Sequence, residues 1–109
     1  MLRSQLLKGT LPLMILSVVD DGELYGYEIA QQIRVRSGAG LAPSEGSLYP
    51  ALHRLERDGA LVGEWKAGSG GPRRRYYRLT PRGVQQLAAS RDEWAHVIGI
   101  VAAVAGSAD

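Results

Sequence analysis

The feature that most constrains the fold is an amphipathic segment at residues 44–59 that leads directly into a basic hairpin. On a helical wheel of about 100° per residue, one face of the segment is apolar and carries Leu48, Ala51, Leu52 and Leu55. The opposite face carries Gly46, Ser47, Pro50, His53, Arg54 and Arg57, with Tyr49 at the boundary. A hairpin then follows over residues 61–66 and 73–79 around a glycine-rich loop at 67–72, with Leu61-Val62 and residues 76–79 as its predicted strands. A short helix followed by an arginine-bearing ribbon predicts a winged helix-turn-helix, a mainly α fold with a small β-hairpin.

The start of this helix has two interpretations. If Ser44 is the N-cap, Pro50 is about the sixth helical residue, removes the hydrogen bond to the Gly46 carbonyl and should bend the helix. If the helix starts at Ser47, Pro50 lies in the first turn, where a proline costs nothing. The sequence does not decide between the two.

Three further helices are expected. Thr10 predicts the cap of a helix over residues 11–19, with Pro12 in its first turn and a separate helical piece at 2–7. A second helix is expected over 25–37, after a turn at 20–22. Thr80 and Pro81 open a last helix that continues to about Val104. Its apolar residues follow a 3-4 spacing and have no obvious cover in so small a domain, which predicts a dimerisation surface.

Composition limits the class of protein. A chain of 109 residues supports one domain, and without cysteine it has no disulfide or thiolate chemistry. No stretch reaches the ~18 continuous apolar residues of a membrane helix. The apolar run at 11–19 lacks a cleavage-type flank, so we interpret it as core. We expect a cytoplasmic protein that does not act on membranes.

The charge is distributed unevenly along the chain. The overall charge is only +2, but residues 54–82 carry eight basic and three acidic side chains, while both flanking segments are net acidic. A basic centre of this kind indicates a local surface that binds a polyanion such as a nucleic acid. A solvated charged hairpin would show the same count, so charge alone leaves both interpretations open.

The outward face of the 44–59 helix has the profile of a helix that enters a major groove. Its small residues, Ser47 among them, allow close approach. Arg54 could bind guanine in bidentate fashion, and His53 and Ser47 could donate to bases or phosphates. The Tyr49 hydroxyl could reach a phosphate, and Pro50 offers a rigid apolar contact for a thymine methyl group.

The hairpin offers a second contact to nucleic acid. Arg73, Arg74 and Arg75 alternate between the two faces of a strand, and near a flexible tip all three could reach phosphates or a minor groove. Alternatively, Arg74 or Arg75 could pair with Glu64 across the hairpin. We expect Trp65 to pack against the body of the domain or against the tyrosines of the opposite strand.

Catalytic and metal-binding patterns are absent from the sequence. His53 and His96 are the only histidines and lie far apart, with no carboxylate spacing that suggests a metal site. No nucleophile elbow, phosphate-binding loop or zinc-protease motif occurs. We therefore expect no metal, no cofactor and no enzymatic activity.

Several strings together resemble the PadR family of transcriptional regulators. They are Lys8-Gly9-Thr10-Leu11, Gly26-Tyr27-Glu28-Ile29, residues 44–56 (SEGSLYPALHRLE) and residues 75–83 (RYYRLTPRG). The resemblance covers about residues 6–104, and the single C-terminal helix is similar to that of the short PadR subfamily.

This resemblance implies a homodimeric winged-helix repressor whose first and last helices form the dimer interface. It implies groove docking by the helix that carries Ser47, Tyr49, Pro50, His53 and Arg54, wing contacts by Lys66 and Arg73 to Arg75, and a supporting contact by Tyr27. In multidrug-sensing members a tryptophan of the last helix lines a ligand site at the dimer centre, and Trp94 has a similar place in the sequence. Read from the residues alone, Trp94 is either dimer core or the wall of a pocket for a planar aromatic effector.

We therefore predict a winged-helix DNA-binding domain at residues 1–80 and a C-terminal dimerisation helix at 81–109, in one continuous structural unit. The predicted function is sequence-specific binding of double-stranded DNA at an inverted-repeat operator, by a homodimeric repressor that a small molecule releases. The alternative is a winged-helix protein–protein module that docks an acidic partner on its basic hairpin.

Overall fold

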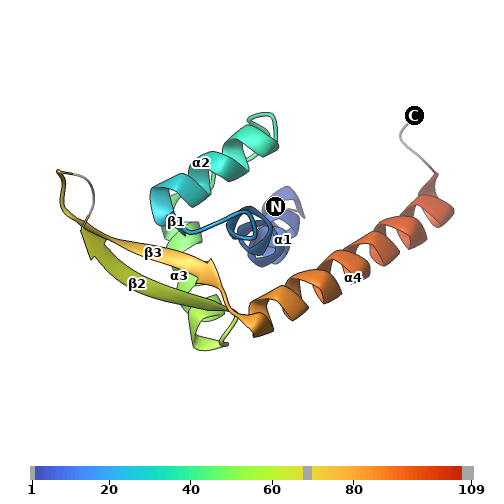
Figure 1. Ribbon diagram of the computed structural model, residues 1–109. Coiled ribbons are helices and arrows are strands. Elements are labelled where there is room, and N and C mark those ends of the chain that lie inside the picture. Colours follow the sequence, from blue (N-terminus) through green and yellow to red (C-terminus); the bar gives the residue numbers. More distant parts are fainter. Residues whose placement is uncertain (1, 68–69, 107–109) are drawn as a thin grey trace.

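The chain forms four helices and a small three-stranded sheet, and the last helix extends away from the others (Figure 1). A computed structural model describes residues 2–67 and 70–106. The elements are α1 (Leu2–Val19), β1 (Leu24–Tyr25), α2 (Gly26–Arg36), α3 (Glu45–Arg57), β2 (Leu61–Ala67), β3 (Arg73–Leu79) and α4 (Pro81–Ala105). Of the predicted loop at the hairpin tip, Gly68 and Ser69 lie outside the described residues. The predicted fold class, a winged helix-turn-helix with a long C-terminal helix, is confirmed.

The first helix differs from its prediction. A helix capped by Thr10, with a separate helical piece before it, is wrong: α1 runs unbroken from Leu2 to Val19, with Pro12 inside it. An interior proline removes one backbone hydrogen bond and its ring crowds the preceding turn, at a cost of about 3 kcal/mol or more. Beyond Pro12 the helix is held by buried side chains on more than one side, namely Ile15, Leu16, Val18 and Val19. Burial of this segment offsets the local cost of the proline.

The third helix begins after Ser44, the first of the two predicted starts. The Ser44 hydroxyl accepts a hydrogen bond from the Ser47 amide at 3.3 Å, and the Ser44 carbonyl accepts one from the Leu48 amide at 2.8 Å. Pro50 therefore lies within the helix and not in a harmless first turn. The helix continues past it because Leu48, Leu52 and Leu55 are all buried on one side.

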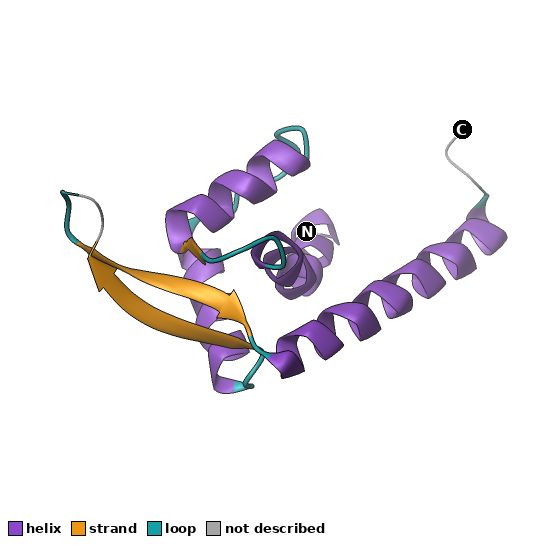
Figure 2. Cartoon of the chain, viewed as in Figure 1, coloured by secondary structure: helices purple, strands orange, loops and turns teal. Residues whose placement is uncertain are grey.

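The sheet has the order β1-β3-β2 and is antiparallel throughout (Figure 2). The predicted hairpin is confirmed, with Gly63 opposite Tyr77 and Trp65 opposite Arg75. Strand β1, whose Tyr25 pairs with Tyr76, was not predicted. A two-residue strand has no alternation to recognise, and the backbone enters α2 directly after it.

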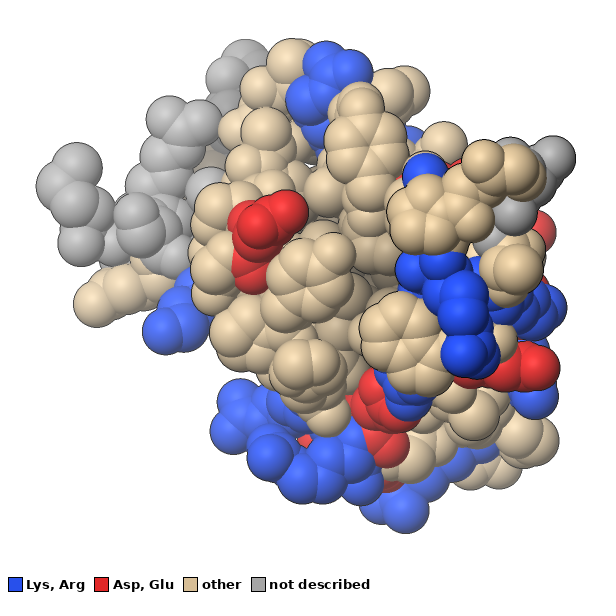
Figure 3. Space-filling view, turned by 90° about the vertical axis from the view of Figure 1, so that its left-hand side faces the viewer, with Lys and Arg blue, Asp and Glu red and all other residues tan. Residues whose placement is uncertain are grey.

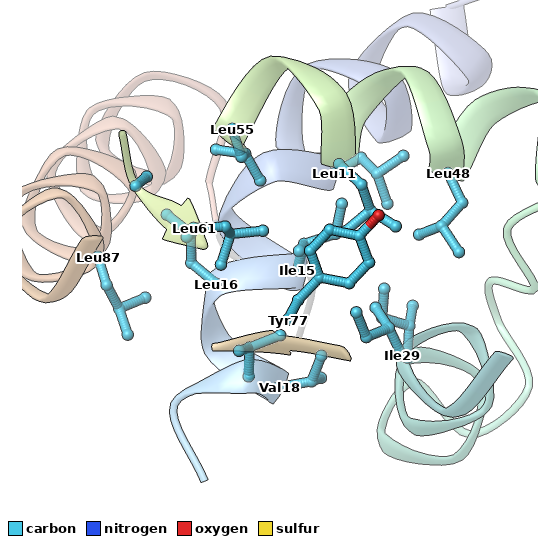
Figure 4. Packing of buried hydrophobic residues seen from close by; sticks show 14 residues of the cluster. Leu11, Ile15, Leu16, Val18, Ile29, Leu48, Leu55, Leu61, Tyr77 and Leu87 are labelled. Atoms are coloured by element: carbon cyan, nitrogen blue, oxygen red, sulfur yellow. The ribbon is translucent and has the colours of Figure 1, made fainter. Parts of the chain in front are cut away.

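The core lies between the sheet, α1, α2 and α3 (Figure 4). Tyr77 extends from β3 into this cluster, and its ring is almost fully buried. Leu87 adds the first turns of α4 to the core. The remaining members are Leu11, Ile15, Leu16, Val18, Val19, Ile29, Ile33, Leu48, Leu52, Leu55, Ala60 and Leu61. The core therefore fixes the orientation of α3 and of the hairpin in one packed unit.

The last helix leaves the body of the domain (Figure 1). Thr80 caps it as predicted, because its hydroxyl accepts a hydrogen bond from the Gly83 amide at 3.0 Å. From residue 91 to residue 106 every side chain is exposed. Among the described residues, no helix has the length and apolar character needed to cross a membrane.

Candidate nucleic-acid interface

The outer face of α3 presents the residues that the helical wheel separated from the core. Ser47, Pro50, His53 and Arg54 are all exposed, whereas the leucines of the opposite face are buried. The small residues lie toward the N-terminal end of the helix, and the cationic ones lie toward its C-terminal end. This face is therefore free to approach a groove without disturbing the core.

Tyr27 and Tyr49 flank the N-terminal ends of α2 and α3. Tyr27 is 63% exposed, and its hydroxyl accepts a hydrogen bond from the side-chain Nε2 of Gln31 at 2.7 Å. Tyr49 packs against Gly26 at the first residue of α2. Glu28 stabilises the start of α2, because its carboxylate accepts a hydrogen bond from the Tyr25 amide at 3.1 Å. Both tyrosines thus lie at the surface beside the outer face of α3.

The inner face of the hairpin, toward α3, holds Arg75. Its guanidinium donates a hydrogen bond to Glu56 of α3 in a half-buried ion pair. It also lies over the ring of Trp65, 5.7 Å from the centroid. The hydrogen bond to Glu56 raises the pKa of Arg75 above its ordinary value, against the opposing effect of burial. The structure thus gives Arg75 a partner on α3, and Glu64 lies opposite Tyr76 instead.

Trp65 differs from its prediction. It is more exposed than expected, at 55%, and it lies opposite Arg75 in the register and not opposite a tyrosine. Its ring is contacted by the Arg75 guanidinium, which also pairs with Glu56 of α3.

The outer face of the hairpin holds Arg74 and Lys66. The Arg74 guanidinium lies 4.7 Å from the centre of the Tyr25 ring, and the Lys66 ammonium lies 5.8 Å from that of Tyr76. Lys66 also donates to the Glu23 carboxylate, and this hydrogen bond raises the pKa of Lys66. Arg73 is exposed nearer the tip. Cations therefore project from this face over aromatic rings.

Figure 3 shows how the charges are arranged on the side of the wing tip. Lys and Arg side chains form several separate groups on this face, and Asp or Glu side chains lie beside some of them. The predicted contact residues of α3 and of the hairpin thus belong to neighbouring elements of one packed unit, held together by the Arg75–Glu56 ion pair.

Sequence reasoning missed Glu23, Glu56 and Gly63. The two carboxylates hold wing cations, and Gly63 provides the space for one of them. Glu56 and Glu23 pair with residues 19 and 43 positions away, so no local sequence pattern identifies them as partners of wing cations. Gly63 did carry a signal, because a glycine inside a strand often marks a close approach of another group.

Trp94 lies on α4, away from the α3 surface. It lines a cavity of about 360 Å³ between α1 and α4, together with Gln5, Gly9, Thr10, Pro12, Leu13, Ser90, Glu93 and Val97. The indole is 40% exposed. Among residues 2–67 and 70–106, no three side chains of metal-ligating type come together.

Comparison with known proteins agrees with this arrangement. The family model for the transcriptional regulator PadR-like family matches residues 15–89. The transcriptional regulator Rv3488 of Mycobacterium tuberculosis is 40% identical over 84 residues, which cover 77% of this chain and 75% of the relative.

Two solved structures are similar over different shares of the chain. The PadR-like transcriptional regulator BC4206 of Bacillus cereus has a TM-score of 0.79 and 35% identity, over 94% of this chain and 98% of the other. Bacillus subtilis PadR, solved in complex with operator DNA, has a TM-score of 0.65 and 26% identity, over 72% of this chain and 45% of that one.

The family model covers most of the chain, and the curated relative exceeds 30% identity over three quarters of it. The predicted resemblance is therefore confirmed. The family consists of transcriptional regulators and not of enzymes, in agreement with the predicted lack of catalysis. This chain belongs to the PadR-like family of transcriptional regulators.

Proposed function

We propose that this protein regulates transcription by binding double-stranded DNA in a sequence-specific manner. The observation that carries the proposal is the division of α3 into a buried leucine face and an exposed face with Ser47, Pro50, His53 and Arg54. The basic hairpin lies beside this helix and is joined to it by an ion pair. That Bacillus subtilis PadR was solved with operator DNA supports the same use of this fold.

The exposed face of α3 reads bases in the major groove. Ser47 and the small residues near it allow close approach, and Pro50 contacts a thymine methyl group. Arg54 donates to guanine in bidentate fashion, and His53 donates to a base or phosphate beside it. The hydroxyls of Tyr27 and Tyr49 contact the phosphate backbone.

The wing supplies contacts that do not depend on sequence. Arg73, exposed near the tip, and Arg74, on the outer face, reach phosphates or the adjacent minor groove, and Lys66 adds positive charge on the face of Arg74. Because the wing and α3 belong to one packed unit, both contacts form together when residues 1–80 dock as the DNA-binding domain.

The regulator acts as a homodimer in the cytoplasm, joined by α1 and by the dimerisation helix within residues 81–109. Apolar side chains of α4 support this assignment, because they lie exposed on a single chain: Trp94, Val97, Ile98, Ile100, Val101 and Val104. Two α3 helices would then enter half-sites about 34 Å apart, so the operator is an inverted repeat.

The dimer is a repressor that a small planar aromatic molecule releases. The cavity between α1 and α4 supports this step, since Trp94 offers a flat ring on which such an effector can stack. The cavity touches the two helices that join the subunits, so an occupant would alter how the two α3 helices are spaced.

A gel shift with the DNA upstream of the gene tests the regulator. Sequence-selective, salt-sensitive retardation is expected, and Arg54→Ala should relax selectivity at one base pair by about 1–3 kcal/mol. Arg91→Ala on α4 is the matched control and should keep full selectivity. Binding without selectivity, or binding only to an acidic protein, would favour the rival function of a protein–protein module.

Fluorescence tests the effector. A planar aromatic ligand should quench tryptophan emission in the unsubstituted protein and not in Trp94→Ala, while Trp94→Ala still binds operator DNA. Equal quenching in both proteins would remove Trp94 from the effector site.

A further inference from the structure

We propose that Arg75 is a positioning residue that fixes the wing against α3 through Glu56, and that it makes no phosphate contact. The inference rests on the proposed DNA-binding function and departs from the sequence-based expectation that all three wing arginines contact DNA. In this proposal Gly63, Arg75 and Glu56 together fix the angle between the wing and α3.

The Arg75 side chain contacts groups of α3 and of the hairpin itself. Its guanidinium donates to the Glu56 carboxylate and lies 5.7 Å from the centre of the Trp65 ring and 5.9 Å from that of Tyr77. The two partners of the ion pair are only 28% and 26% exposed. The Nη2 contact to Glu56 holds the guanidinium toward α3 in a half-buried position, so a phosphate contact would have to compete with this pair.

Gly63 provides the space in which the guanidinium lies. A Cβ atom built on Gly63 would stand 2.6 Å from Arg75 Nε and 2.8 Å from Cζ. Any side chain at this position would therefore displace the guanidinium. The glycine inside β2 is explained by this close approach, because glycine otherwise weakens a strand.

The ion pair connects the two elements that meet DNA. Glu56 lies in α3, two positions after Arg54, and Arg75 lies in β3, next to Arg74. A change in this pair is therefore transmitted to the relative placement of base-reading and phosphate-binding side chains. Small displacements of this kind lower affinity without removing any contact group.

Glu56→Gln distinguishes a positioning role of the ion pair from a simple effect of charge on DNA binding. Removing a negative charge from a DNA-binding surface should strengthen binding by charge alone. We expect Glu56→Gln instead to weaken operator binding by about tenfold, because the neutral amide holds the guanidinium less firmly and interaction energies between contacting residues reach this scale. Glu64→Gln is the matched control: it removes the same charge from the exposed surface of β2 and should bind as well as the unsubstituted protein or better.

Gly63→Ala tests the same geometry without changing any charge. It should weaken binding about as much as Glu56→Gln, because its methyl group displaces Arg75. The added methyl meets the end of a flexible side chain and not the backbone, so the fold should survive. Gly71→Ala, at an open position near the wing tip, is the control and should leave binding unchanged.

Arg75→Gln separates positioning from phosphate contact. It should weaken operator binding but leave the salt dependence unchanged, whereas each lost phosphate contact lowers the slope of log affinity against log salt by about 0.9. Adding Glu56→Gln to Arg75→Gln should cause no further loss, because both substitutions break the same pair.

The emission of Trp65 gives a readout in the absence of DNA. In a Trp94→Phe background Trp65 is the sole tryptophan. Glu56→Gln and Gly63→Ala should shift or intensify its emission, because the guanidinium leaves the indole, while Glu64→Gln and Gly71→Ala should not. The displacement of the Arg75 guanidinium can thus be detected by Trp65 fluorescence in the protein without DNA.

The outcomes distinguish this inference from the proposed function. Stronger binding by Glu56→Gln, or a slope lowered by about 0.9 in Arg75→Gln, would overturn the inference while leaving DNA binding intact. Unchanged Trp65 emission in both Glu56→Gln and Gly63→Ala would also overturn it. If the unsubstituted protein bound no DNA selectively, the proposed function would fail, and the inference would fail with it.

Discussion

The Tyr49 ring of α3 lies directly over Gly26, the first residue of α2: a Cβ atom built on Gly26 would stand 2.8 Å from the Tyr49 hydroxyl oxygen and 3.2 Å from two ring carbons. Gly26 is buried, while Tyr49 is 39% exposed. The two helices of the helix-turn-helix are thus in contact at their N-terminal ends. This close approach explains the glycine at a helix position that other residues could fill.

Gly26→Ala should therefore destabilise the domain. The added methyl group overlaps the Tyr49 ring, and overpacking of this kind typically costs about 1–3 kcal/mol. Urea denaturation would measure the loss in the free energy of unfolding. Combining it with Tyr49→Ala should recover part of the loss attributed to Gly26→Ala, because the overlapping ring is gone. If Gly26→Ala were as stable as the unsubstituted protein, the Tyr49 ring would have to move away from the added methyl group at no measurable cost in stability.

Arg73→Ala and Arg74→Ala should weaken binding to every DNA sequence alike. Both side chains belong to the wing, where contacts go to phosphates and carry no base information. Each substitution should lower the slope of log affinity against log salt by about 0.9, as measured by fluorescence anisotropy across a salt series. Arg91→Ala, which removes the same charge from α4, should leave the slope unchanged. Equal slopes in all three proteins would exclude the wing from the DNA interface.

Local patterns predicted what depends on local structure. The 3.6-residue period placed Leu48, Leu52 and Leu55 on the buried face of α3, and the burial of all three confirms this. The hairpin and the Thr80 cap were predicted for the same reason, since their signals lie within a few residues. The start of α3 stayed open because Ser44 and Ser47 both resemble caps, and only the observed hydrogen bonds choose Ser44.

Long-range contacts account for what the sequence did not predict. Two-residue β1 exists because Tyr25 pairs with Tyr76, more than fifty residues away in the chain. The partners of Lys66 and Arg75 also come from distant segments, so the wing cations could be recognised but not their carboxylates. The unbroken α1 is a third case, because packing of residues 15–19 holds a helix that Pro12 alone would interrupt.

The exposed apolar surface of α4 should make the protein dimeric. Ile98 and Val101 are 50% and 56% exposed on the single chain, one turn apart on the helix. At micromolar concentration, sedimentation equilibrium should give the mass of a dimer, and Ile98→Glu with Val101→Glu should give that of a monomer, because the new charges would be buried at the interface. Val35→Glu, at an exposed valine of α2, should stay dimeric. A monomer in the unsubstituted protein would contradict the proposed role of α4.

Stability should fall at alkaline pH through Tyr77. Burial raises the pKa of the Tyr77 phenol above its ordinary value of 10.0, and the nearby Glu56 carboxylate raises it further, against the opposing effect of Arg75. The folded chain therefore holds this proton more tightly than the unfolded chain. The resulting contribution to the free energy of unfolding is fully present below pH 10.0 and is lost as the pH rises through the raised pKa.

Urea unfolding curves recorded between pH 8 and pH 11 would measure this loss as a fall in the urea concentration at the unfolding midpoint. In Tyr77→Phe the loss should be smaller, because this side chain has no proton to release from the core. The pKa of Lys66 is also raised, so part of the alkaline decline should persist in this variant. Tyr27→Phe, at an exposed tyrosine, should decline like the unsubstituted protein. An equal decline in Tyr77→Phe would assign the alkaline transition to the wing cations and not to the core tyrosine.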